Sequence, residues 1–142
     1  MAVIAPRTPR NAIYPLHAFL LSASVPLFLG ALLSDIAYAQ SYQIQWSNFA
    51  SWLIAGALVF AGMALLWAFI DLFRAGRRAS KGGVYFLLLL AAWVLGFVNA
   101  LVHAKDAWAI MPASLVLSGV VALLACAATW VGFSTIRLGD AT

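Results

Sequence analysis

Two histidines are the residues of this chain whose chemistry could most readily serve a function. His17 and His103 are the only ones, and axial imidazoles from two helices are a common way to hold a haem iron. His17 opens the first long apolar segment and His103 closes the third. In an antiparallel bundle most of the roughly 30 Å hydrocarbon layer would separate them, so one haem could not use both within a chain. We expect structural hydrogen bonds from both, with haem or quinone binding as the alternative. His103 also precedes Asp106 by three residues, a spacing that on a helix would suit a metal ion or a proton relay.

Three further polar residues, Asp35, Asp71 and Asn99, lie within apolar segments, where such groups are costly and are candidates for function. Asp71 precedes Arg74 by three residues, so an ion pair at the membrane edge is favoured over a transport role. Asp35 has no cation within one helical turn, so structural and functional roles are equally open. Asn99 is predicted to form a hydrogen bond with a neighbouring helix.

Motifs that would indicate an enzyme are missing from the sequence. There is no phosphate-binding glycine loop, no nucleophile elbow and no zinc or iron–sulfur spacing. The single cysteine, Cys126, follows Ser118 and Ala122 at four-residue intervals and is predicted to be a small packing residue. We therefore expect a protein that is not an enzyme and has no obligatory cofactor.

The elements that carry these residues follow from composition. Of 142 residues, 65% are hydrophobic and only 8% are charged, which excludes a soluble domain and a disordered chain. Four apolar segments are long enough to cross a bilayer: residues 13–38, 49–73, 84–103 and 112–136. Short connections make consecutive helices antiparallel. The sequence predicts one integral membrane domain, an all-α up-down-up-down bundle of four transmembrane helices.

The distribution of cations predicts the orientation of this bundle. One side would carry all but one of the eight lysines and arginines: Arg7, Arg10, Arg74, Arg77, Arg78, Lys81 and Arg137. Only Lys105 falls on the other side. Short basic loops stay in the cytoplasm, so we expect both termini inside, in the inner membrane of a bacterium. The basic loop 74–83 is expected to contact lipid headgroups rather than nucleic acid.

The amino-terminal segment also has features of a secretory signal. Arg7 and Arg10 precede an apolar run, and Ala-Tyr-Ala at residues 37–39 could serve as a cleavage site. The run 16–33 exceeds the usual apolar core of a signal, which is about 7–15 residues long. We therefore expect this segment to stay as the first span.

Several segments resemble a known family. Tyr-Pro-Leu-His at residues 14–17, Ser-Asp-Ile-Ala-Tyr at 34–38, Ile-Asp-Leu at 70–72 and Asn-Ala-Leu-Val-His at 99–103 are similar to domain-of-unknown-function family 2231. The resemblance covers about residues 14–130. It implies a small bacterial four-helix inner-membrane protein without assigning an activity, and an association with redox proteins such as cytochromes and quinoprotein dehydrogenases. Tyr14 stands where the family often has a histidine, and Ala18 where it often has a proline. Both differences count against a metal or haem role for the opening motif.

These observations define one main hypothesis and two alternatives. The main hypothesis is a non-catalytic accessory or anchoring subunit of a larger membrane complex, with a redox complex as a candidate. Its partners would be the lipid bilayer and another membrane protein or further copies of itself. One alternative is an electron-transfer subunit that binds haem or quinone through His17 or His103. The other is a small transporter or channel lined by Asp35, Asp71 and Asn99.

Overall fold

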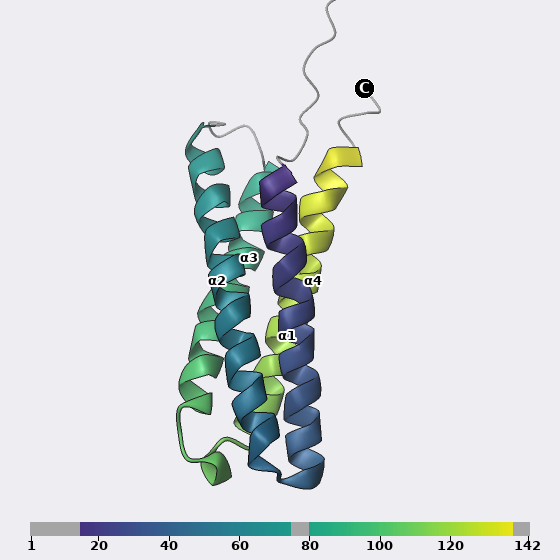
Figure 1. Ribbon diagram of the computed structural model, residues 1–142. Helices are drawn as coiled ribbons and strands as arrows, with labels where there is room; N and C mark the ends of the chain where they lie inside the picture. The colour runs from purple at the N-terminus through teal and green to yellow at the C-terminus, as the bar shows by residue number, and fades with distance from the viewer. Residues whose placement is uncertain (1–14, 75–79, 138–142) are drawn as a thin grey trace, which may run out of the picture.

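Four long α-helices and one short 3-10 turn make up the part of the protein that the structure describes. The computed structural model describes residues 15–74 and 80–137. The elements are α1 (Pro15–Ser41), α2 (Ile44–Arg74), α3 (Ser80–His103), η2 (Ala107–Ala109) and α4 (Ala113–Arg137). Successive helices run in opposite directions, and each packs against two neighbours in the ring order α1, α2, α3, α4 (Figure 1).

The bundle has two distinct ends. The start of α1 and the end of α4 lie together at one end, here called the terminal end (Figure 1). The α1–α2 turn, the end of α3 and η2 lie at the opposite end, here called the η2 end and comprising residues 38–51 and 103–113. All four helices are long and apolar enough to cross a membrane, which confirms the predicted four-helix membrane bundle.

The first connection is much shorter than the sequence indicated. The spans expected at 13–38 and 49–73 leave residues 39–48 as the connection, but α1 continues to Ser41 and α2 begins at Ile44. The Tyr42 N–H donates to the Tyr38 carbonyl at 2.7 Å, and Tyr42 adopts a left-handed backbone with φ of 52°. This conformation ends a helix abruptly. The expectation failed because uncharged polar residues are compatible with a helix that reaches the membrane surface.

Small residues allow the helices to approach closely along the bundle axis. Ala57 and Ala61 of α2 are fully buried against Phe28 of α1, and their four-residue spacing places both on one face of the helix. On α4 the buried positions include Ser118 and Ala122. The packing role expected for Cys126 was wrong: its side chain is exposed, because it lies about 100° around the helix from the buried Ala125.

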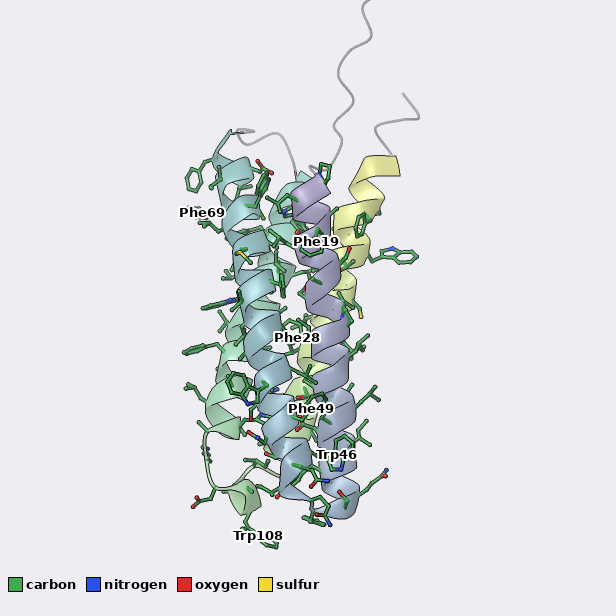
Figure 2. All side chains as sticks on the ribbon, viewed as in Figure 1. Phe19, Phe28, Trp46, Phe49, Phe69 and Trp108 are labelled. Atoms are coloured by element: carbon green, nitrogen blue, oxygen red, sulfur yellow. The ribbon has the colours of Figure 1, made fainter. Side chains whose placement is uncertain are left out.

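The outer surface of the bundle is strongly apolar. Phe19, Phe49 and Phe69 point outward and are 45–60% exposed, whereas Phe28 lies inside at 3% (Figure 2). In water such a surface would be an aggregation hazard. Lipid solvates it without cost, so the exposed rings agree with a chain that spans a membrane.

One tryptophan explains the need for a glycine on α2. The Trp93 indole N–H donates to the Leu58 carbonyl at 3.1 Å, which supplies the partner that a deeply placed indole requires. A Cβ at Gly62 would lie only 3.0 Å from that indole nitrogen. The close approach of α3 to α2 therefore depends on the absence of a side chain at residue 62.

Candidate functional site

The most deeply buried acid of the described chain lies near the η2 end. Asp35 has no exposed surface and sits six residues before the end of α1, about 9 Å along the helix. Two other helices supply its partners. His103 Nε2 of α3 lies 2.9 Å from Asp35 Oδ1, and the Ser118 hydroxyl of α4 donates to Asp35 Oδ2 at 2.5 Å. A carboxyl group in an apolar bundle needs such partners to be tolerated.

The hydrogen bonds continue from these partners into a closed network. Asn99 Nδ2 donates to the Ser118 hydroxyl oxygen at 2.8 Å, and His103 Nδ1 donates to the Asn99 carbonyl at 3.0 Å. Asn99 and His103 are four residues apart and so share one face of α3. The four residues Asp35, Asn99, His103 and Ser118 are called the polar network below. It connects α1, α3 and α4 through side chains that are all at least nine-tenths buried.

The polar network tolerates the buried Asp35 because the positions of its hydrogens leave no net charge. A carbonyl only accepts, so His103 Nδ1 carries a hydrogen. The Ser118 hydrogen points to Asp35 Oδ2. One proton then bridges His103 Nε2 and Asp35 Oδ1, and the pair has zero net charge whether that proton sits on the ring or on the carboxyl group. A neutral pair of this kind avoids the large cost of a lone charge in an apolar medium.

The order of the bonds differs from that of a serine hydrolase. An activated serine hydroxyl donates to a histidine, which an acid orients from behind. Here Asp35 lies in the middle, with Ser118 and His103 on its two oxygens. The network therefore lacks a histidine base on the hydroxyl of Ser118.

A cavity of about 450 Å³ opens beside the polar network at the η2 end. It lies between the start of α2 and the connection that follows α3, and its lining is formed by Ile44, Gln45, Ser47, Asn48, Ser51, His103, Lys105 and Ala107. His103 thus belongs both to the network and to the wall of the cavity. A volume of this size is in the range of small-molecule sites.

A second, smaller polar cluster lies toward the terminal end. His17 Nε2 and the Tyr85 hydroxyl are 2.8 Å apart, and Asp71, exposed in the last turn of α2, interacts electrostatically with both. The buried apolar cluster that includes Phe28 and Val121 lies between this group and the polar network. Among the described residues, Asp71 is therefore not brought together with Asp35 and Asn99, which the transporter hypothesis had placed along one path.

The structure limits the haem roles suggested for the histidines. His17 and His103 lie at opposite ends of the bundle, so one haem cannot use both within a chain. Both ring nitrogens of His103 are engaged, with Asp35 and the Asn99 carbonyl, so the residues around His103 do not fit an axial haem ligand.

The suggested pairing of His103 with Asp106 was wrong. The helix ends at His103, and Asp106 is an exposed residue that precedes η2, so helical spacing does not apply to the two. No group of three metal-ligating side chains occurs in residues 15–74 and 80–137.

Some predicted contacts lie outside the described structure. Arg77 and Arg78 fall between residues 75 and 79, and the side chains of Arg74 and Lys81 are likewise not described. The ion pair expected between Asp71 and Arg74 and the lipid contacts of the basic loop therefore stay predictions.

Ser118 is the network member that the sequence did not single out for chemistry. It was interpreted as a small residue for close packing, yet it bonds both Asn99 and Asp35. A signal was present in the sequence: Ser114 and Ser118 repeat at a four-residue interval in an otherwise apolar segment, and both are buried. Asn99 does form the interhelical hydrogen bond that was expected for it.

Together, the apolar helices and the buried polar network define a multi-pass membrane protein of the four-helix type. Residues 13–136 match the family described as predicted membrane protein (DUF2231), and the chain belongs to this family. The matched range includes every member of the polar network. No curated protein and no solved structure matches the chain.

Proposed function

We propose that the protein is a non-catalytic accessory subunit of a larger membrane complex in the bacterial inner membrane, with both termini in the cytoplasm. The observation that carries the proposal is a pair of exposed aromatic side chains, Tyr42 and Trp108, held in a fixed position at the η2 end. The rings of Tyr42 and Trp108 are stacked with centroids 6.3 Å apart at 19°. They are 61% and 85% exposed, and Figure 2 shows Trp108 projecting from the extremity of the bundle.

Several contacts hold this pair in place. Tyr38 is buried below Tyr42, with ring centroids 5.9 Å apart, and donates from its hydroxyl to the Ala107 carbonyl at 2.9 Å. This bond connects the end of α1 to η2, next to Trp108. The left-handed backbone at Tyr42 costs on the order of 1–2 kcal/mol, and residues held in this way concentrate at functional positions. Rigid exposed aromatic rings are frequent anchors of protein interfaces.

The chemistry of the polar network supports the non-catalytic part of the proposal. Ser118 lacks a histidine base, and both ring nitrogens of His103 are engaged. The same bonds fix α1, α3 and α4 relative to one another beneath the aromatic pair. A network of this kind makes the helix ends beneath the aromatic pair rigid. Rigidity lowers the entropic cost of docking a partner protein on the pair.

The cation distribution supports the proposed orientation. Arg7, Arg10 and Arg137 lie near the two ends of the sequence, and the basic segment 74–83 falls where α2 ends and α3 begins, at the terminal end of the bundle. Positive segments are retained in the cytoplasm. The η2 end would then face the periplasm, together with Lys105.

The test is the size of the particle extracted from native membranes. The tagged chain is solubilised in a mild detergent and analysed by native electrophoresis and mass spectrometry. We expect an assembly well above the 15.2 kDa of the single chain. Trp108→Ala and Tyr42→Ala should release the chain from it. Trp130→Ala is the matched control, because Trp130 is 79% exposed but lies in the second half of α4, away from the η2 end. A lone monomer in the wild-type extract would refute the proposal.

The electron-transfer alternative is tested on the same material by its absorption spectrum. We expect purified chain without a Soret band, because both ring nitrogens of His103 are engaged and His17 Nε2 is bonded to the Tyr85 hydroxyl. A Soret band that disappears in His17→Ala or in His103→Ala would favour the haem-binding alternative instead.

A further inference from the structure

The cavity at the η2 end is built around the start of a helix. Gln45, Ser47, Asn48 and Ser51 all come from the first two turns of α2 and bring neutral hydrogen-bonding groups to its wall. The first turn of this 31-residue helix contains no acidic residue. The partial positive charge at a helix start is therefore not neutralised by its own side chains.

One of these groups has a hydroxyl that is free to bind a ligand. Ser47 is only 5% exposed, lines the cavity, and its hydroxyl makes no hydrogen bond to any residue that the structure describes. The hydroxyl oxygen is not among the fully buried unpartnered atoms of the described residues, so it stays accessible from the cavity. A ligand oxygen in the cavity would accept a hydrogen bond from it.

A single cation completes the wall. Lys105 follows α3, lines the cavity opposite the start of α2 and forms no ion pair within residues 15–74 and 80–137. Its exposed neighbour Asp106 is not paired with it in the structure. The other titratable group in the wall, His103, shares one proton with Asp35, so that pair adds no net charge. The described lining thus has a net charge of about +1 at neutral pH.

We propose that this cavity binds a phosphate group, with Lys105 as its counter-charge and the Ser47 hydroxyl and the start of α2 as hydrogen-bond donors. Phosphate oxygens accept several bonds at once, and helix starts combined with a lysine are suited to such anions. At about 450 Å³ the cavity accommodates a phosphate that carries an organic group. Since the η2 end lies at the membrane surface, that group is either a soluble phosphate monoester or the headgroup of a phospholipid.

The experiment uses the full chain, delipidated in a detergent that contains no phosphate. Glycerol 3-phosphate is titrated by calorimetry as the soluble probe. Dioleoyl phosphatidylglycerol is added in parallel and its retention measured by native mass spectrometry, with dioleoylglycerol as the lipid that lacks the phosphate. Saturable binding of the soluble probe assigns the site to a soluble monoester. Retention of the phospholipid alone, without dioleoylglycerol, assigns it to a headgroup.

Substitutions connect the binding to this cavity. Lys105→Gln should weaken it about tenfold, because it removes a charge-assisted hydrogen bond. Ser47→Ala should weaken it about threefold. The matched controls are Arg77→Gln, which removes a cation from the other loop, and Ser134→Ala, which removes a hydroxyl bonded within α4 at the terminal end. Both should change the affinity less than twofold. Absence of binding by either probe, or equal effects of Lys105→Gln and Arg77→Gln, would overturn the proposal. These binding results do not test the proposed role as an accessory subunit, because that role is tested separately by the size of the particle extracted from membranes.

Discussion

The imidazole of His103 on α3 lies 2.9 Å from the carboxyl group of Asp35 on α1, although 68 residues separate them in the chain. Asp35 lies about 9 Å from the end of α1 and has no exposed surface, whereas His103 is 9% exposed and borders the cavity at the η2 end. With one shared proton the pair is neutral overall, and Ser118 and Asn99 satisfy the atoms that face away from the bridge. This arrangement makes specific predictions about which substitutions the fold tolerates.

Asp35→Asn should preserve the fold. An asparagine can accept from Ser118 with its oxygen and donate to a neutral His103 Nε2 with its amide, so the neutral network persists. We expect the free energy of unfolding to change by less than about 1 kcal/mol for Asp35→Asn, and to fall by about 2–4 kcal/mol for Asp35→Leu, which leaves two buried groups unpaired. Both are measured by titration with sodium dodecyl sulfate in mixed micelles. Equal damage from the two variants would show that the network requires a charged carboxylate.

Asn99 and Ser118 should be energetically coupled. A double-mutant cycle with Asn99→Ala and Ser118→Ala reports the hydrogen bond between α3 and α4. We expect a coupling of about 0.6–1.7 kcal/mol, which are the average and the largest values typical of such bonds inside membranes. The control cycle pairs Asn99→Ala with Ser134→Ala, whose hydroxyl donates to a carbonyl of its own helix at the terminal end, and should be additive. Additivity in both cycles would contradict the structure.

Gly62 should tolerate a methyl group poorly, unlike Gly56 in the same helix. A Cβ at residue 62 would meet the Trp93 indole nitrogen at 3.0 Å, whereas one at residue 56 would meet a Leu27 methyl at an ordinary 3.6 Å. Gly62→Ala should lower the free energy of unfolding by about 1–3 kcal/mol through overpacking. Gly56→Ala should be neutral or stabilising by up to about 1 kcal/mol, because alanine favours helix. Adding Trp93→Leu to Gly62→Ala should remove the clash, and a lack of any such relief would argue against this contact.

The two ends of the bundle should label on opposite sides of the membrane. In a Cys126→Ser background, Lys105→Cys at the η2 end should react with a membrane-impermeant maleimide in intact spheroplasts. Arg77→Cys should react only after permeabilisation, because the basic loop is expected in the cytoplasm. Gel-shift labelling measures both. The reverse pattern would place the termini outside, and labelling of both in intact spheroplasts would contradict a four-span protein.

Much of the architecture was readable from the sequence because it depends on local properties. The length and apolarity of each segment decide whether it spans a bilayer, and short connections decide that neighbours are antiparallel. These two facts also placed His17 and His103 at opposite ends. The cost of a polar group in an apolar segment marked Asp35 and Asn99 as residues that need partners.

Only the tertiary structure decided which residues are the partners of Asp35 and Asn99. The helices are apolar on nearly all sides, so the sequence marks no inward face and does not define how each helix is rotated about its axis. Packing around small residues such as Ala57 and Ala61 sets these rotations. They bring His103 and Ser118 to the two oxygens of Asp35, and they leave a cavity between the start of α2 and Lys105. Contacts between distant segments depend on such rotations, which is why neither the polar network nor the cavity was evident before the helices were assembled.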